Sequence, residues 1–284
     1  MNPDRQKSLA DCFRQLHHGP NILVLANCWD VASARVLEAE GVPAIATSSA
    51  GVAFSLGYPD GQRISRDEML AVVARVAKAV KVPVTADVES GYGPHPQDAA
   101  RTAQAVIEAG TVGMNLEDSR DESDTALADL SLAVEKIRAV REAGSKAGVP
   151  LVINARTDVY LNQVGAPESR YDHALRRAVA FRDAGADCIF LPGIKEQELI
   201  ARFVKDLKFP INILAGPGFP AIAELQRLGV ARVSLGSKPM LAGLGTLRRL
   251  AQELQRKGTY SALEGAVAYV EMQKLLEQQL ALGT

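Results

Sequence analysis

A short apolar run follows a helical segment and a glycine again and again along the chain, and this repeat constrains the fold more than any other feature. The helical segments end in signals such as EAGTVG and DAGADC, where Gly suits the position after a helix. Strictly alternating strands and helices force parallel pairing through right-handed crossovers. Eight runs rich in Val, Ile and Leu are predicted to be buried strands: 22–26, 43–47, 83–88, 112–116, 150–155, 188–191, 211–214 and 232–235.

Eight such units close a barrel more naturally than they fill an open sheet. We therefore predict an α/β protein, a (β/α)8 TIM barrel that forms one catalytic domain over residues 1–257. An open doubly wound sheet is the alternative, and no GxGxxG follows the first strand to support it.

A helical segment beyond the eighth unit is surplus to the barrel. Residues 258–284 are predicted to form a C-terminal extension, helical from Tyr260 to Leu282, with apolar residues near helical spacing. This apolar face needs a surface to cover, which either a neighbouring subunit or the chain's own barrel can provide.

The composition excludes several classes of protein. The chain has 284 residues, 47% of them hydrophobic and 23% charged, which is enough apolar material for a core. The net charge of -1 and the lack of like-charge runs argue against nucleic acid and anionic membranes as partners. Because the amino-terminal segment lacks a signal-peptide apolar region and Cys12, Cys28 and Cys188 show no metal or disulfide spacing, we expect a cytoplasmic protein with reduced thiols.

Acidic side chains follow two adjacent predicted strands at the barrel end where catalytic groups are expected. Asp87 and Glu89 end the third strand, and strand periodicity points both to one side. Glu117 ends the fourth strand and can approach them. Three crowded carboxylates favour a hard divalent cation, so we predict a Mg²⁺ site, with Mn²⁺ as the alternative ion. The competing interpretation is that these acids are solvated or paired with Arg and Lys.

Residues around this cluster suggest how an anionic ligand would be held. Arg156 ends the fifth strand, and its planar fork suits a carboxylate or phosphate. It could equally neutralise Glu117 or Asp118. The small residues Ser48 to Ala50, within TSSAG, offer backbone N–H groups to an anion, although an ordinary tight loop would have the same sequence. No Ser/His/Asp order, P-loop or HExxH motif is present.

Five segments occur in the same order in a known barrel superfamily: NCWDVASAR, GYPDGQRISRDEM, VTADVESGYG, MNLEDS and INARTD. Over about residues 20 to 240 the chain resembles the isocitrate lyase and phosphoenolpyruvate mutase superfamily. The resemblance implies a Mg²⁺-dependent site for 2-oxo acids and related carboxylates, with Asp87, Glu89 and Glu117 as metal-site acids and Arg156 as the substrate-binding arginine. It also implies a homodimer or homotetramer in which the final helix is exchanged between barrels.

The same resemblance assigns the remaining site residues. Ser48, Ser49 and Ala50 match the small loop that holds a carboxylate or phosphonate, and Asp60 in GYPDG matches an acid near the reacting centre. Beyond the resemblance, we expect Asp60, Tyr58 or a water at the metal to move the proton, with Tyr58 also placed against the substrate.

Departures from the family pattern leave the reaction open. The segment EDSRDESDTALADLS follows the fourth strand in place of the family's KKCGH lid and contains neither Cys nor Lys. Cysteine-dependent isocitrate cleavage and mutase chemistry are both weakly supported as a result. The leading hypothesis is a Mg²⁺-dependent lyase acting on a small 2-oxo or 2-hydroxy di- or tricarboxylic acid in carboxylic acid metabolism. The alternatives are P–C or P–O chemistry on phosphonopyruvate or phosphoenolpyruvate, and a 2-oxo acid binding protein with little turnover.

Overall fold

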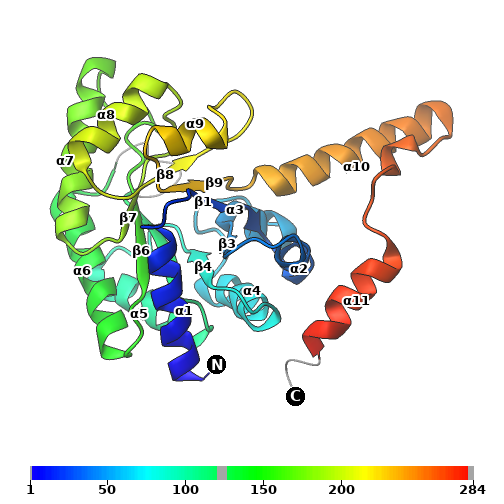
Figure 1. The fold of residues 1–284 in the computed structure, drawn as a ribbon, viewed down its shortest axis with the longest axis horizontal. Coiled ribbons are helices and arrows are strands. Elements are labelled where there is room, and N and C mark those ends of the chain that lie inside the picture. Colours follow the sequence, from blue (N-terminus) through cyan, green and yellow to red (C-terminus); the bar gives the residue numbers. More distant parts are fainter. Residues whose placement is uncertain (1, 120–126, 281–284) are drawn as a thin grey trace.

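The computed structural model describes residues 2–119 and 127–280, and its central feature is one parallel sheet rolled into a nearly closed barrel (Figure 1). The sheet order β1-β9-β8-β7-β6-β5-β4-β3-β2 closes because β1 and β2 are successive pieces of one strand, separated at Ala26. The strands are β1 Leu23–Leu25, β2 Asn27–Cys28, β3 Ile45–Thr47, β4 Val84–Asp87, β5 Gly113–Glu117, β6 Val152–Arg156, β7 Cys188–Phe190, β8 Ile211–Leu214 and β9 Arg232–Ser234.

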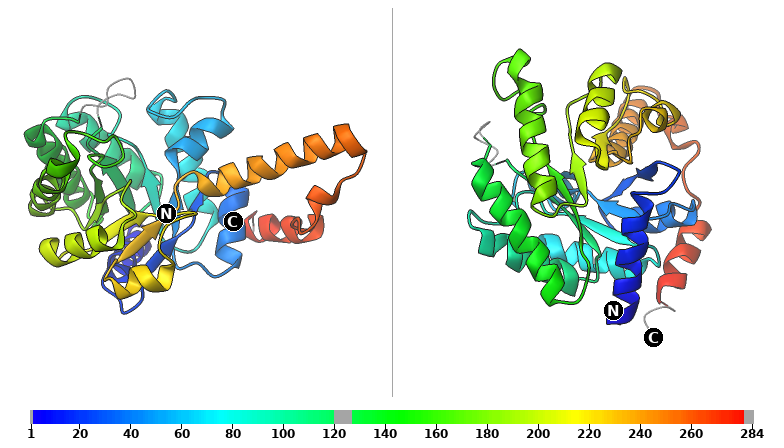
Figure 2. Two further views of the ribbon diagram at one scale, coloured as in Figure 1. Left: turned by 90° about the horizontal axis from the view of Figure 1, so that it is seen from above. Right: turned by 60° about the vertical axis from the view of Figure 1, so that its left-hand side comes forward.

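Helices surround the barrel, and α1 runs across its amino-terminal end (Figures 1 and 2). Every predicted strand is present, and the (β/α)8 prediction is confirmed. The helices are α1 Pro3–Leu16, α2 Val31–Ala39, α3 Ser49–Ser55, α4 Arg66–Ala79, α5 Pro96–Glu108, α6 Leu130–Lys146, η1 Pro167–Ser169, α7 Arg170–Asp183, α8 Gln197–Leu207, α9 Ile222–Arg227, α10 Lys238–Lys257, η2 Ser261–Leu263 and α11 Tyr269–Leu280.

Local sequence signals set where the helices begin and end. Asp30 and Ser65 cap α2 and α4, and each forms a capping box with the residue three positions later. Gly110 and Gly185, in two of the predicted turn signals, have φ of 88° and 107°, which a side chain would strain.

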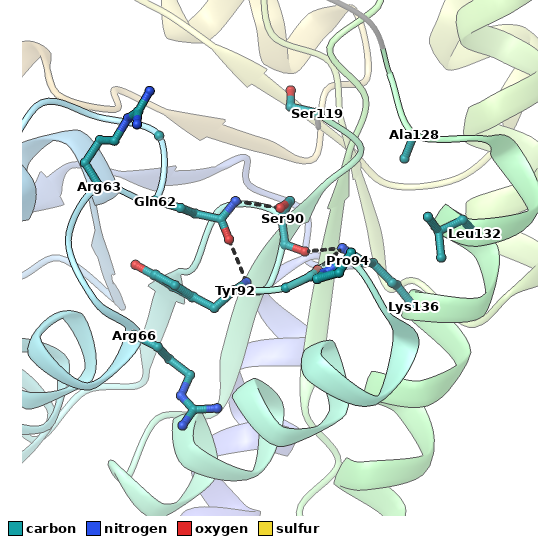
Figure 3. Close-up of a pocket in the computed structure, with 12 residues that line it drawn as sticks. Gln62, Arg63, Arg66, Ser90, Tyr92, Pro94, Ser119, Ala128, Leu132 and Lys136 are labelled. Atoms are coloured by element: carbon teal, nitrogen blue, oxygen red, sulfur yellow. Dashed lines mark hydrogen bonds between the residues drawn. The ribbon is translucent and has the colours of Figure 1, made fainter. Parts of the chain in front are cut away.

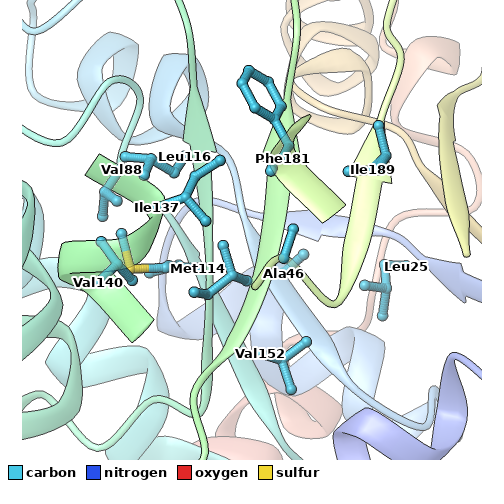
Figure 4. Close-up of a cluster of buried hydrophobic side chains, with 14 of the residues drawn as sticks. Leu25, Ala46, Val88, Met114, Leu116, Ile137, Val140, Val152, Phe181 and Ile189 are labelled. Carbon is cyan, nitrogen blue, oxygen red and sulfur yellow. The ribbon is translucent and has the colours of Figure 1, made fainter. Parts of the chain in front are cut away.

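The hydrophobic core lies between the strands and the surrounding helices. Ala46, Met114 and Ile189 on the strands pack with Ile137 and Phe181 from the helices in one buried cluster (Figure 4). Inside the barrel the register is continuous across neighbouring strands. It aligns Glu117 with Arg156, Arg156 with Phe190, Phe190 with Asn212, and Asn212 with Arg232.

The C-terminal extension differs from the prediction of one helix over residues 260–282. Glycines with positive φ at Gly258 (65°) and Gly265 (78°) break the helical path, leaving η2 and a separate α11. Residues 281 and 282 lie outside the described part of the chain. Helix α10 projects from the barrel, and α11 returns beside α2, where Arg35 Nε donates to the Leu275 carbonyl at 3.0 Å (Figures 1 and 2).

Helices α10 and α11 leave apolar side chains uncovered. Leu247 on α10 is 59% exposed, Tyr269 is 77% exposed and Val270 is 61% exposed. Within residues 2–119 and 127–280, no helix is both long enough and apolar enough to cross a membrane.

Candidate active site

Asp87 occupies the carboxyl end of β4, at the mouth of the barrel. Its Oδ2 accepts from both the backbone N–H (3.1 Å) and the hydroxyl (3.0 Å) of Ser49, and its Oδ1 accepts from Asn115 Nδ2 at 3.1 Å. Asn115 in turn accepts from Asn154 Nδ2 at 2.7 Å. Asp87 is only 8% exposed, so these donors hold its carboxylate in one orientation.

Glu89 reaches the same mouth by a route that strand periodicity does not describe. Strand β4 ends at Asp87, and Glu89 lies in the following turn with a left-handed φ of 54°. The prediction that Asp87 and Glu89 share one face of a strand is therefore wrong. Glu89 Oε2 accepts from the Gln62 backbone N–H at 2.7 Å, and the Glu89 carbonyl accepts from the Glu117 N–H at 2.9 Å.

Gln62 connects the α3–α4 loop to the turn that carries Glu89. Its Nε2 donates to Ser90 Oγ and its Oε1 accepts from the Tyr92 N–H, both at 2.7 Å (Figure 3). From α6, Lys136 Nζ donates to the Ser90 and Gly93 carbonyls at 2.9 and 2.8 Å. These contacts offset the backbone strain at Glu89 and Tyr92, the latter with φ of 56°.

Glu117 and Arg156 meet at the ends of β5 and β6. Glu117 Oε2 lies 2.7 Å from Arg156 NH1, while Arg156 Nε and NH2 bind Asp158 at 2.6 and 2.9 Å. Burial raises the pKa of Glu117 well above its usual value; Arg156 opposes this rise, and Asp158, Asp87 and Glu89 add to it. Burial lowers the pKa of Arg156, but Glu117 and Asp158 raise it by more, so the net shift is upward and the guanidinium stays charged. The sequence-based alternative that Arg156 neutralises Glu117 thus describes a contact that is present.

A second buried ion pair, between Asp118 and Arg177, supports the Glu117–Arg156 pair through Asp158. Asp118 is paired with Arg177 of α7 (Nε to Oδ2, 2.6 Å), not with Arg156. Asp118 Oδ1 also accepts from the Asp158 N–H at 3.0 Å. Arg177 therefore fixes Asp118, Asp118 fixes the backbone of Asp158, and Asp158 fixes Arg156.

The small loop after β3 lies against the acidic cluster. Ser48 caps α3 by accepting from the Gly51 N–H at 3.2 Å, whereas Ser49 bonds to Asp87 and Ala50 is buried beside it in the first turn of α3. The structure thus brings Ser49 into the site directly. Ser48 contributes by fixing where α3 begins.

Asp60 and Tyr58, both from the GYPDG segment, have different surroundings in the structure. Asp60 is partly buried and lies near Tyr92. Burial raises the pKa of the Tyr92 phenol, and Glu89, Asp87, Asp60 and Glu117 raise it further, so the phenol stays protonated. Tyr58 instead is 37% exposed, and its hydroxyl contacts Glu68 Oε1 at 3.4 Å, so the structure does not bring it into this group.

An open cleft of about 600 Å³ adjoins the cluster (Figure 3). Arg63, Arg66 and Lys136 are among its lining residues, and Ser90, Tyr92 and Ser119 face it from the turns that carry Glu89 and Glu117. The acidic segment that stands in place of the family's lid falls partly on residues 120–126, which lie outside the described residues. A β-bridge pairs Ser119 with Leu127, the described residues on either side.

The cluster fits a hard divalent cation in donor chemistry and in charge. Asp87, Glu89 and Glu117 offer only oxygen atoms, and mutual repulsion contributes to the raised pKa of Glu117, which a bound cation would relieve. No group of three or more His, Cys, Asp or Glu side chains in residues 2–119 and 127–280 is already spaced to hold a metal. The carboxylates instead bind Ser49, Gln62 and Arg156, so metal binding would require Glu117 to leave or share its arginine.

Sequence reasoning missed four residues of the site: Asn115, Asp158, Arg177 and Gln62. Asn115 is aligned with Asp87 and Asn154 across three strands, so correct register could have identified it. Asp158 lies two residues after Arg156, at the expected strand end. Arg177 and Gln62 come from a helix and a long loop, where no local pattern marks a residue that supports a distant site.

An acid-rich, arginine-containing site at the carboxyl ends of barrel strands defines the class of protein as a TIM-barrel enzyme. The family model for phosphoenolpyruvate phosphomutase matches residues 13–255. The chain therefore belongs to this family, and the predicted resemblance to the isocitrate lyase and phosphoenolpyruvate mutase superfamily is confirmed. Carbon–carbon lyases and mutases are among its relatives.

Three relatives show how far the similarity extends. An uncharacterised protein of Mycobacterium tuberculosis is 38% identical over 264 residues, covering 93% of this chain and 95% of the relative. A solved structure from Burkholderia cenocepacia has a TM-score of 0.89 and 37% identity, covering 95% of this chain and 96% of the other. Oxaloacetate decarboxylase 2 of Pseudomonas fluorescens is 29% identical over 264 residues, covering 90% of this chain and 83% of that enzyme.

Proposed function

We propose that the chain is a Mg²⁺-dependent lyase that cleaves a C–C bond, or decarboxylates, in a small 2-oxo or 2-hydroxy di- or tricarboxylic acid. The observation that carries this proposal is the convergence of Asp87, Glu89 and Glu117 with Arg156 at one barrel mouth. A relative that is an oxaloacetate decarboxylase supports the same substrate class. The choice between cleavage and decarboxylation depends on the substrate.

Asp87, Glu89 and Glu117 would hold the ion, with Mn²⁺ as a substitute. When bound, Mg²⁺ supplies a Lewis acid that polarises the oxygens of a chelating 2-oxo acid and stabilises negative charge as a bond to carbon breaks. Ser49 and Asn115 keep Asp87 oriented for this task, and Gln62 does the same for Glu89. Such supporting contacts keep a metal ligand from rotating away.

Arg156 would bind a substrate carboxylate. Three of the five N–H groups of a guanidinium are used by Glu117 and Asp158, which leaves two for a ligand. Because Asp158 accepts hydrogen bonds from both Nε and NH2 of Arg156, the guanidinium is oriented before substrate binds. Ser48, Ser49 and Ala50 at the start of α3 would bind the remaining anionic group, and Asp60 beside Tyr92 would move the proton.

The alternative reaction is P–C or P–O chemistry on phosphonopyruvate or phosphoenolpyruvate. The match to the phosphomutase family model favours keeping this candidate. A further candidate is a protein that binds a 2-oxo acid with little turnover, which the lack of a cysteine in EDSRDESDTALADLS favours.

A substrate panel separates these functions. The purified chain is incubated with 2-oxo acids, 2-hydroxy acids and phosphonates in the presence of Mg²⁺, while organic products, CO₂ and inorganic phosphate are measured. We expect an organic acid product that disappears with a chelator and returns with Mg²⁺. Phosphate release would instead identify the alternative reaction, and calorimetric binding without product over hours would identify a binding protein.

Matched variants test which residues carry the activity. Asp87→Asn and Arg156→Gln should each lower turnover by about 10² or more, because each removes a charge used in the transition state. Asp67→Asn, which changes an exposed carboxylate at the start of α4, should keep the wild-type rate. Wild-type rates in both site variants would overturn the proposal.

We also propose that the C-terminal extension, residues 258–284, joins subunits into a homodimer or homotetramer. The exposed apolar side chains of α10 and α11 support a neighbouring barrel as the surface that they cover. Light scattering at micromolar concentration tests this assembly, and a monomer would refute it. A cytoplasmic location stays a prediction that fractionation of cells can test.

A further inference from the structure

Arg232, at the start of β9, is a buried cation at the end of the barrel opposite the site. It is 0% exposed, and its side chain points into the barrel because Val233, the next residue, packs in the hydrophobic cluster outside. Its Nε makes one long hydrogen bond to Ser234 Oγ, at 3.4 Å. Among residues 2–119 and 127–280, neither NH1 nor NH2 has a hydrogen-bond partner, and no carboxylate forms an ion pair with this guanidinium.

Helix α1 closes the barrel below Arg232. The Phe13 ring lies 6.0 Å from the guanidinium carbon, and His17 packs edge-on against Phe13 with ring centroids 4.9 Å apart. His17 Nδ1 donates to the Phe13 carbonyl at 2.8 Å. Burial, with Arg232 adding to it, lowers the pKa of His17 to about 3, so its Nε2 is a bare acceptor, and no described residue donates to it.

The terminal nitrogens of Arg232 are left without acceptors. They carry four N–H groups, and no described residue accepts from any of them. The Thr85 hydroxyl, His17 Nε2 and Asn154 Oδ1 are also buried without a partner among the described residues. Burial lowers the pKa of Arg232 to about 10, so the side chain still carries its charge at neutral pH. The charge of Asp87 reaches Arg232, but Asp87 forms no hydrogen bond or ion pair with it, so the buried guanidinium has neither an acceptor on its terminal nitrogens nor a carboxylate in direct contact.

We propose that the base of the barrel binds one small inorganic anion, of the size and charge of chloride, against the terminal nitrogens of Arg232. A monovalent anion supplies the missing acceptors and cancels one positive charge. Phe13 lies against the guanidinium and His17 packs on Phe13, which favours a halide over a bulkier organic acid. The site is separate from the mouth, since Arg232 begins β9 whereas Glu117 and Arg156 end β5 and β6.

A cleft adjoins His17 at this end of the barrel. It has a volume of about 410 Å³ and is lined by His17 and by Ala231, the residue before Arg232. Lys208 and His18 are also among its lining residues, and the described lining contains no carboxylate side chain. Basic groups at a cleft raise the local concentration of anions.

Bromide provides a direct probe. Crystals of the full chain soaked in sodium bromide should show an anomalous difference peak within hydrogen-bond distance of Arg232 NH1 or NH2. In solution, thermal unfolding is compared in chloride and in gluconate at constant ionic strength. At a chloride concentration 100 times its dissociation constant, the unfolding equilibrium constant should fall about 100-fold relative to gluconate.

Two variants assign the effect to Arg232. Arg232→Met, which is similar in length and uncharged, should remove the difference between chloride and gluconate. Arg249→Met, which changes an arginine on α10 outside the barrel that bonds to Thr246, should keep it. Water in place of bromide at Arg232, or an equal halide response in Arg232→Met, would overturn the proposal. If Arg232→Met does not fold, the bromide peak in the wild-type protein still decides the question.

Discussion

Replacing Arg177 with Met should destabilise the protein strongly, because it strands a buried carboxylate. The side chains of Arg177 and Asp118 are 5% and 1% exposed, and Nε lies 2.6 Å from Oδ2. Removing one partner of a buried ion pair costs about 3–5 kcal/mol. For a chain of this length the unfolding entropy is about 0.6 kcal/mol/K, so the unfolding midpoint should fall by about 5–8 °C.

The cost should also depend on pH in a defined direction. Burial raises the pKa of Asp118 above its ordinary 3.8, and Arg177 opposes the rise, so its removal should raise this pKa further. Because the native state binds this proton more tightly than the unfolded state, the free energy of unfolding is highest below the unfolded pKa. It then falls as the pH rises through the native pKa. The deficit of Arg177→Met should therefore shrink when the pH is lowered from 7 to 5.

Urea unfolding followed by circular dichroism at both pH values measures these effects. Asp118→Asn combined with Arg177→Met should recover most of the loss, because the amide removes the charge and can still accept from the Asp158 N–H. Arg182→Met on the same helix breaks an ion pair with Asp183, whose side chain is 60% exposed, and should cost about 0.5 kcal/mol or less. A cost below about 1 kcal/mol for Arg177→Met, or a deficit that does not change with pH, would refute the reasoning.

Three further predictions follow from contacts at the mouth and the base. Gln62→Leu removes the bonds to Ser90 and Tyr92 and should weaken Mg²⁺ affinity about 10–100-fold by calorimetry; unchanged affinity would contradict the supporting role. Arg156→Lys loses the bidentate contact with Asp158 and should lower kcat/KM at least about tenfold. Wild-type kinetics in this variant would count against orientation of Arg156 by Asp158. Since burial lowers the pKa of His17 to about 3, acidification from pH 8 to 5 should cost about 2 kcal/mol, measured by urea unfolding; His17→Leu should remove this dependence.

Much of the fold could be predicted because the signals that define it are local. Apolar runs, helix caps and glycines between them specify alternating strands and helices, and parallel strands then leave their carboxyl ends at one mouth. That rule alone placed Asp87, Glu117 and Arg156 together. It failed for Glu89, because β4 stops at Asp87 and a left-handed backbone continues from there. The left-handed turn is fastened by Gln62, which comes from a loop 27 residues earlier.

The sequence by itself determined which residues exist at each strand end and which of them carry charge. Only the tertiary structure decided their partners. Asp118 pairs with Arg177, 59 residues away, and Arg156 pairs with Asp158 as well as with Glu117. The same holds for Arg232. Strand periodicity predicts that Arg232 and Ser234 share a face, but closure of the barrel decides that this face points inward, where the Arg232 side chain is fully buried.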